Sequence, residues 1–223
     1  MVRKGILVVV VAALVSAVPL SEARTESMPG QWAVGFRVGP AFLLEEAAVA
    51  TATTKTLQGE TGPLLNLVAA YMINDFLALG FDLEWEQHTI KGEGTTWGKT
   101  STASILPRGE LHLGSGTPFS PYFIFGVGYN FNFFSEDSGL SSTVGVNRQV
   151  DLDDSFALMT GIGADMFFMS DRFAMNLEVK VKHNRAHMKV MSGTVQEGLF
   201  DFKGHSLSIL FGFRYHFPSS PHF

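Results

Sequence analysis

The 223-residue chain contains no cysteine, and few of its residues are charged. The absence of cysteine excludes a disulfide framework and a thiolate metal site. Charged residues make up 17% of the chain, whereas soluble globular proteins average about a quarter. Hydrophobic residues reach 46%, which excludes a disordered chain because burial of that surface can offset the ordering entropy. The formal net charge of -5 argues against a general nucleic-acid binder, so we expect no nucleic-acid partner.

Long hydrophobic runs are also missing beyond the first residues of the chain. The longest early run, Ile6 to Val15, follows Arg3 and Lys4 and precedes a small-x-small sequence that ends at Ala23. This layout is typical of a secretory signal peptide, and the run is shorter than the roughly 20 residues that a spanning helix needs. We therefore predict a cleaved signal peptide over residues 1–23, with a retained N-terminal anchor as the alternative. No later segment is long and apolar enough for a transmembrane helix.

The remaining chain alternates between apolar and polar residues with a period of two, which predicts β-strands. In the cleanest segment, Leu79, Phe81 and Leu83 share one face, while Asp82 and Glu84 share the other. Eight segments show this alternation, most of them with ten or more residues: 32–39, 65–73, 76–90, 100–113, 123–133, 156–168, 173–182 and 206–217. Such lengths exceed the usual strand of about 5–6 residues and suit a tilted membrane-spanning strand of about 9–11.

The connections between these segments distinguish a soluble barrel or sandwich from a membrane barrel. Every second connection is longer than its neighbours: 45–61, 91–99, 135–153 and 185–203, against 74–75, 114–120 and 170–172. Outer-membrane barrels have short turns at one end and longer loops at the other. We therefore predict an all-β fold, an eight-stranded antiparallel up-and-down transmembrane β-barrel over residues 24–217, followed by a C-terminal tail, 218–223. The expected location is the bacterial outer membrane.

The same alternation assigns the polar faces of the strands to the barrel interior. Basic and acidic side chains nearly balance there, and an eight-stranded barrel is only wide enough for side chains to fill it. Unpaired buried charges cost several kcal/mol, so we expect a salt-bridged lumen. Such a lumen is either a narrow polar path or a sealed plug. The predicted channel-lining residues are Arg37, Asp82, Glu84, Glu86, His88, Arg108, Glu110, His112, Asp165, Glu178, Lys180, Lys182 and Arg214.

Several motifs resemble the OmpW-like family of eight-stranded outer-membrane barrels. They are Arg37-Val38-Gly39, residues 70–75, His88-Thr89-Ile90, Leu106-Pro107, residues 121–130, Phe133-Phe134 and residues 212–217. The resemblance implies passage of small, often apolar, molecules through a narrow barrel. It also implies that the barrel-assembly machinery recognises the aromatic-terminated last strand. Two strands depart from the family by being more polar, with Asp82, Glu84 and Glu86 in one and Arg108, Glu110 and His112 in the other.

The expected function is therefore a non-catalytic channel for small molecules, including apolar ones. The alternative is a structural or adhesive surface barrel that acts through its extracellular loops and has a closed interior. A lipid-modifying catalytic set could be drawn from His88, Ser101 or Ser104, and Glu86, but no family motif supports it. We predict no catalytic residues and no cofactor.

A last group of residues lies near the long-loop end of the final two strands. His183, Arg185, Lys203 and His205 are candidates for contact with lipopolysaccharide, because Lys and Arg attract its phosphates. The alternative is a solvated base of a loop. His187 adds a third histidine, but the spacing matches no metal site, and we predict none. The expected partners are thus outer-membrane lipid, lipopolysaccharide, the assembly machinery and a small-molecule permeant.

Overall fold

A computed structural model of the chain describes residues 29–44, 48–50, 56–92, 95–113, 118–137, 148–168, 172–192 and 195–217. The predicted signal peptide and the tail from residue 218 lie outside these ranges, so both stay predictions. Within the described ranges no helix is long and apolar enough to cross a membrane.

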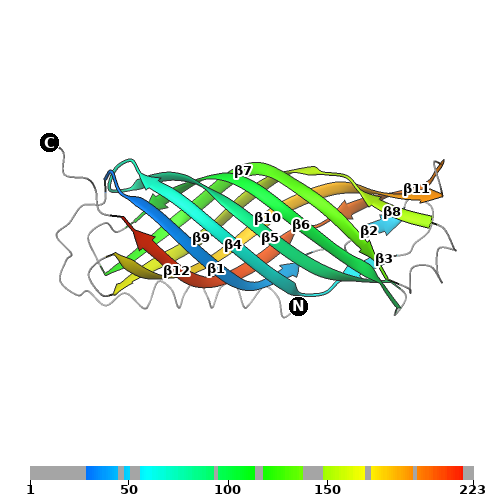
Figure 1. The fold of residues 1–223 in the computed structure, drawn as a ribbon, viewed down its shortest axis with the longest axis horizontal. Coiled ribbons are helices and arrows are strands. Elements are labelled where there is room, and N and C mark those ends of the chain that lie inside the picture. Colours follow the sequence, from blue (N-terminus) through cyan, green and yellow to red (C-terminus); the bar gives the residue numbers. More distant parts are fainter. Residues whose placement is uncertain are drawn as a thin grey trace.

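Eight strands form a closed antiparallel barrel (Figure 1), which confirms the predicted fold class. Each strand pairs with the next of the set, and the last pairs with the first, from Ala33 opposite His216 to Leu43 opposite Ser206. A closed barrel has no open sheet edge, which the membrane interior would not tolerate. The strands are β1 (Trp32–Leu43), β4 (Gly62–Met72), β5 (Leu77–Gly92), β6 (Thr95–His112), β7 (Phe119–Glu136), β9 (Ser155–Phe168), β10 (Phe173–Ser192) and β12 (Ser206–His216).

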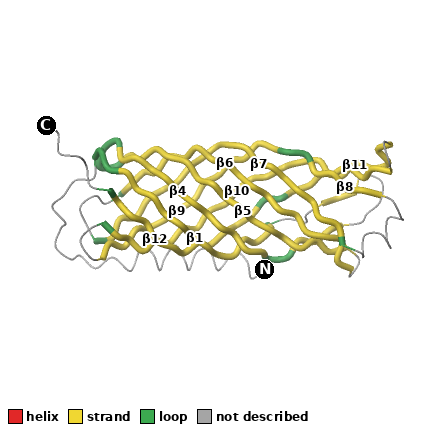
Figure 2. The backbone as a smooth tube through the Cα atoms, in the orientation of Figure 1, coloured by secondary structure: helices red, strands yellow, loops and turns green. Residues whose placement is uncertain are grey.

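Four short strands extend the wall at one end of the barrel: β2 (Ala48–Ala50), β3 (Thr56–Gly59), β8 (Arg148–Leu152) and β11 (Val195–Lys203). Strand β11 pairs with β10 and β2, β2 pairs with β3, and β3 pairs with β5, so the ring continues beyond β1 and β12. Figures 1 and 2 show this extension at the end opposite the tight turns.

The extension corrects all four of the longer predicted connections, since β2 and β3 lie within 45–61, and β8 and the end of β7 lie within 135–153. The described residues of 91–99, and most of those of 185–203, are strand rather than loop, because β5 and β6 pair as far as Gly92 opposite Thr95, and β10 and β11 as far as Ser192 opposite Val195. The apolar alternation ends in these segments, since side chains there no longer face lipid. Backbone pairing does not depend on that alternation and continues into the polar end of the barrel.

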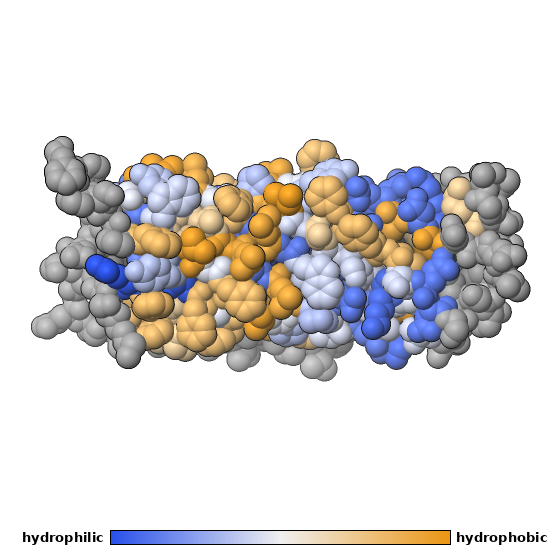
Figure 3. Space-filling view, viewed as in Figure 1, coloured by the Kyte–Doolittle hydropathy of each residue, from blue (hydrophilic) through white to orange (hydrophobic). Residues whose placement is uncertain are grey.

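The outer surface of the barrel carries a belt of apolar side chains. Phe36, Phe81 and Phe213 are 45–53% exposed, as expected where lipid rather than protein covers them. Figure 3 shows apolar residues over the part of the barrel near the tight turns, whereas the extension is mostly hydrophilic. The belt therefore covers only part of the barrel length.

Aromatic rings gather at both edges of this belt. At the tight-turn end, the ring centroids of Trp32 and Tyr71 lie 5.1 Å apart, and those of Phe173 and Tyr215 lie 4.8 Å apart. At the other edge, Tyr129 and Phe156 are 6.2 Å apart. Such girdles mark the two interfaces of a membrane with water.

Candidate functional site in the barrel interior

All thirteen predicted interior residues point into the barrel, and none is more than 5% exposed. They come from β1, β5, β6, β9, β10 and β12, so the site is assembled from nearly the whole circumference. Their shared orientation follows from the two-residue period, because successive side chains of a strand point to opposite faces. Their role as the lining of a channel stays a prediction.

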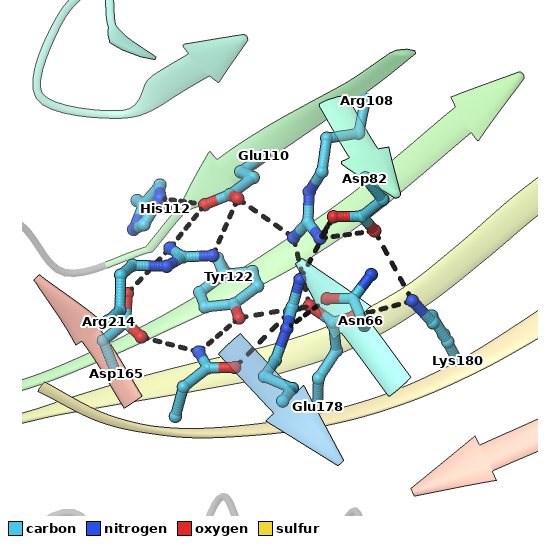
Figure 4. A network of polar contacts seen from close by, with 12 residues as sticks. Asn66, Asp82, Arg108, Glu110, His112, Tyr122, Asp165, Glu178, Lys180 and Arg214 are labelled. Atoms are coloured by element: carbon cyan, nitrogen blue, oxygen red, sulfur yellow. Dashed lines mark hydrogen bonds and ion pairs between the residues drawn. The ribbon is translucent and has the colours of Figure 1, made fainter. Parts of the chain in front are cut away.

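Two carboxylates form the centre of the interior network (Figure 4). Asp82 contacts Arg37 at 3.1 Å, Arg108 at 2.9 Å and Lys180 at 3.4 Å. Glu178 contacts the same three cations, with 3.0 Å to Arg108, 3.4 Å to Lys180 and an ion pair to Arg37. All five side chains are fully buried. Each cation is thus shared between two carboxylates, which offsets its loss of hydration.

A second group of ion pairs lies toward the tight-turn end. Arg214 binds Glu110 through two parallel contacts of 2.9 Å and reaches Asp165 at 2.9 Å. His112 places Nε2 3.0 Å from Glu110 and Nδ1 3.0 Å from the hydroxyl of Ser120. Arg108 connects this group to the centre, because it also contacts Glu110 at 2.9 Å. The two-pronged geometry of Arg214 favours a fixed arrangement over a mobile one.

A third group continues the network toward the extension. Lys182 contacts Glu84 at 3.3 Å and Glu86 at 3.1 Å, and it donates to the hydroxyl of Ser104 at 3.0 Å. Ser206 donates to Glu86 at 3.2 Å, and Lys180 also pairs with Glu84. The interior charges therefore form one connected network across the barrel.

Tyr122 is an interior residue that the sequence analysis missed. Its hydroxyl donates to Glu178 at 3.3 Å and accepts from Asn176 at 2.7 Å. The guanidinium of Arg214 lies 5.3 Å from the centre of its ring. Gly163 directly opposite makes room for the ring, since a Cβ there would lie 2.4 Å from the Tyr122 Cζ atom. The inward glycine was the available signal, because it indicates a large neighbour across the strand pair.

A neutral polar layer follows the charged network on the side of the extension. Asn132 and Asn184 exchange amide contacts, with 2.9 Å from Asn184 Nδ2 to Asn132 Oδ1. Ser155 donates to Asn184 at 2.5 Å, Thr102 donates to Asn132 at 2.9 Å, and Ser104 donates to Asn130 at 2.7 Å. These bonds satisfy the buried amides, which would otherwise be costly to desolvate.

Apolar side chains fill the interior within the extension, and we call this cluster the outer apolar layer. It includes one polar atom, the indole nitrogen Nε1 of Trp97, which has no hydrogen-bond acceptor among the described residues. The layer consists of Leu43, Ile90, Trp97, Leu152, Ala186, Met188 and Phe202, all at most 7% exposed. A smaller apolar cluster near the tight turns contains Ala70, Met72, Ala78, Phe167 and Ala174. The charged network thus lies between two apolar ends.

Of the residues considered for catalysis, His88 and Glu86 lie 3.9 Å apart in the interior, but no described contact brings either serine to His88. His88 points inward and Ser101 lies on the outer face, where it bonds Gln87 at 3.1 Å. Ser104 is inside but donates to Asn130. Within the described ranges, no three His, Asp or Glu side chains are grouped so that they could hold a metal ion.

The four lipopolysaccharide candidates lie on the outer face, on strand wall rather than at the base of a loop. His183 and Arg185 belong to β10, Lys203 ends β11, and His205 lies between β11 and β12. The rings of His183 and His205 are 4.9 Å apart, and Arg185 is opposite Lys203. Farther out on β10, Lys189 donates to Asp153 at 2.5 Å, and this hydrogen bond raises the pKa of the Lys189 ammonium.

Comparisons with known proteins agree with this architecture. The crystal structure of the outer membrane protein OprG from Pseudomonas aeruginosa is similar, with 15% identity, a TM-score of 0.74, and coverage of 88% of this chain and 99% of that one. The solid-state NMR structure of the outer membrane protein AlkL in DMPC lipid bilayers is also similar, with 16% identity, a TM-score of 0.60, and coverage of 92% of this chain and 98% of that one. No curated protein sequence matches the chain significantly. Both structural likenesses concern the fold.

The sequence profile of the outer membrane protein beta-barrel domain matches residues 10–217. That match covers most of the chain, and its barrel agrees with the closed ring, the apolar belt and the aromatic girdles of the structure. The chain therefore belongs to the outer membrane protein beta-barrel domain family and is a protein of the bacterial outer membrane.

Proposed function

We propose that the barrel admits small apolar molecules at its extended end and releases them sideways into the membrane, without conducting ions along its axis. The observation that carries the proposal is the division of the interior into an outer apolar layer and a closed network of buried ion pairs. The resemblance to OmpW-like barrels supports the apolar class of permeant.

The charged network opposes axial passage. A solute that moves along the axis must separate Asp82 and Glu178 from the cations Arg37, Arg108 and Lys180, whose side chains are all fully buried. Removing a buried ion from its partners costs several kcal/mol, because the low-dielectric interior offers no replacement for water. Ions and polar solutes therefore meet a large barrier at this layer.

The outer apolar layer imposes no such cost. An apolar molecule entering among Met188, Phe202 and Ile90 displaces apolar side chains only, and dispersion contacts replace dispersion contacts. Met188 suits this role, since unbranched methionine side chains adapt to irregular shapes. The indole N–H of Trp97 supplies one donor for a permeant that carries a single acceptor.

The wall beside this layer has an interruption in its backbone pairing. On β1, Leu43 of the outer apolar layer is followed inward by Ala41, which packs with Leu64 and Leu210 in a second apolar cluster. The β1–β12 ladder keeps one register but lacks the pairs of Gly39 and Pro40 between Val38 and Ala41, where Pro40 has no N–H to donate. An apolar path along β1 therefore ends beside Pro40, a position of the wall that cannot donate a backbone hydrogen bond to β12.

The proposal is tested by two measurements on the same protein. Reconstituted barrels should be electrically silent in planar bilayers, and cells that produce the protein should take up an apolar fluorescent dye faster than cells without it. The variant Met188→Gln places a polar group in the outer apolar layer and should slow dye uptake several-fold. Met191→Gln makes the same change on the same strand outside that layer and should leave uptake unchanged.

Two outcomes would contradict the proposal in different ways. Steady ion conductance would show that the charged network opens. Dye uptake that does not depend on the protein would instead favour the structural or adhesive alternative, for which the closed interior and the extension beyond the belt are the supporting observations. Deletion of surface loops should then abolish adhesion.

A further inference from the structure

We infer that the outer face of β10, β11 and the start of β12 carries a binding site for the phosphate groups of outer-leaflet lipopolysaccharide. We call the surface formed by His183, Arg185, Lys203 and His205 the basic patch. The inference is independent of what passes through the barrel, because the patch lies on the outside of the wall.

The height of the basic patch on the wall is fixed by two neighbouring strands. Along β10 the outward residues are apolar up to Val181 and then change to His183 and Arg185. On the neighbouring strand β12 the outward residues are apolar as far as Leu207, and the preceding outward residues along the chain are His205 and Lys203. Val181 lies opposite Leu207 in the register, so both strands change from apolar to basic at the same level. That level is the boundary of the lipid belt, where headgroup phosphates lie.

The patch places like charges directly opposite each other. Arg185 and Lys203 are Cα partners in the β10–β11 ladder, so two cationic side chains lie side by side on the outer face, where an anion that contacts both is favoured. Asp201 contacts Arg185 at 3.4 Å and His187 at 3.2 Å, but it lies two residues farther from the belt than Lys203. The guanidinium of Arg185, with a side chain 68% exposed, remains available to an anion on the lipid side.

A backbone hydrogen bond fixes the orientation of the His205 ring, so that its Nε2 atom can act as a hydrogen-bond donor. Its Nδ1 atom accepts a hydrogen bond of 3.2 Å from the backbone N–H of Asn184. The neutral ring therefore carries its proton on Nε2, which can donate to a phosphate oxygen. The ring of His183 on β10 lies beside it in an edge-to-face arrangement, with the ring centroids 4.9 Å apart.

Apolar side chains flank the patch and favour a lipid phosphate over a soluble anion. Leu158 is the register partner of His183 on β9 and is 58% exposed, and Phe156 at the start of that strand is 76% exposed. On the other flank, Leu44 is 43% exposed and its N–H donates to the carbonyl of His205. A phosphate joined to acyl chains can satisfy the basic side chains and cover this apolar rim together.

The opposite side of the barrel shows no such patch at the same boundary. Beyond Trp85, the outward residues of β5 are Gln87 and Thr89, and Gln87 bonds Ser101 of β6. The next outward cation, Lys91, is neutralised by Glu60 at 2.6 Å. Lys99 of β6, the register partner of Thr89, is also exposed on this side, so β5 and β6 present two separate lysines rather than a cluster of four basic residues.

The test measures lipid A binding to the full-length protein, purified in detergent, by native mass spectrometry. The double variant Arg185→Gln/Lys203→Gln should weaken binding of bis-phosphorylated lipid A by about 10- to 30-fold, given the attraction expected per cation near a charged surface. Dephosphorylated lipid A should bind the unaltered protein as weakly as bis-phosphorylated lipid A binds this variant. The control Lys91→Gln/Lys99→Gln removes the same charge elsewhere and should keep the original affinity.

Three results would overturn the inference. They are equal weakening in both double variants, undiminished binding of dephosphorylated lipid A, and competition by inorganic phosphate at the same concentration as the lipid. The last result would assign the patch to a free anion. Equal heat-modified gel migration of the variants verifies that each barrel is folded, which is expected because the exchanged side chains are on the surface.

Discussion

Glu178 illustrates how a single interior residue depends on the whole barrel. Its carboxylate forms ion pairs with Arg37 of β1, Arg108 of β6 and Lys180 of its own strand. It also accepts a hydrogen bond from Tyr122 of β7. Asp82 contacts the same three cations, so the two carboxylates share their neutralisation. Removal of one carboxylate therefore leaves charge without compensation, a far larger effect than loss of an exposed pair.

We predict that Glu178→Gln lowers the free energy of unfolding by about 3–5 kcal/mol, because the amide cannot neutralise the three neighbouring cations. Urea titration of the barrel in lipid vesicles measures this change. Glu60→Gln is the matched control, since its ion pair with Lys91 joins side chains 49% and 44% exposed, and it should cost less than about 1 kcal/mol. Similar losses in both variants would argue against a closed, dry network.

Among the strands, β1 is the one that closes the barrel. It pairs with β12 on one side and β4 on the other, although β12 is the last strand of the chain. Gly39 allows close approach beside Pro40, because a Cβ at Gly39 would lie 1.9 Å from the carbonyl oxygen of Ile209. The backbones of β1 and β12 thus approach closely at Gly39, while the neighbouring Pro40 contributes no N–H to the pairing.

The natural absence of cysteine permits a direct test of this seam. Phe36 and Phe213 are register partners that both face outward, and the Cα spacing of paired residues suits a disulfide. We predict that Phe36→Cys/Phe213→Cys forms a cross-link on oxidation, seen as altered gel migration. Phe36→Cys/Phe211→Cys pairs positions about 7–8 Å apart on the diagonal and should cross-link poorly. Preferential cross-linking of this second pair would mean a shifted register.

The whole molecule is longer than the membrane it crosses. The apolar belt and its two aromatic girdles enclose one part of the barrel, and the hairpins β5–β6 and β10–β11, with β2, β3 and β8, extend the other part into water (Figure 3). Outer-membrane barrels place short turns in the periplasm and the longer connections outside the cell. The outer apolar layer and the basic patch then belong to the extracellular side.

This orientation predicts which engineered thiols are accessible on intact cells. Lys99→Cys, in the exposed extension, should react with a membrane-impermeant maleimide. Asp75→Cys, in the tight turn between β4 and β5, should react only after the outer membrane is permeabilised. The fraction labelled at each site reports the orientation, and labelling of Asp75→Cys alone would require the reverse one.

The strand positions within the belt and the direction of the thirteen predicted interior side chains were predictable, because lipid contact imposes a strict two-residue period on the belt. Outside the belt that constraint disappears, and the strands at 91–99 and 185–203 were read as loops. Tyr122 was missed for a related reason: it is an inward residue whose aromatic character resembles that of the lipid-facing set. Gly163 opposite Tyr122 shows that space across the interior, rather than polarity, decided its direction.

The alternating strands and the balanced charges on their inward faces follow from local sequence, since the strand period and the lipid environment act residue by residue. Which of those charges meet depends on how the strands are arranged around the closed barrel. Lys180 reaches Asp82 across 98 positions of sequence, and Arg214 reaches Glu110 across 104. These contacts depend on the stagger of the strands and on closure by β12, which place distant residues at one level of the axis. The inward charges of separate strands form one connected network of ion pairs because the barrel closes, and no local sequence pattern produces those contacts.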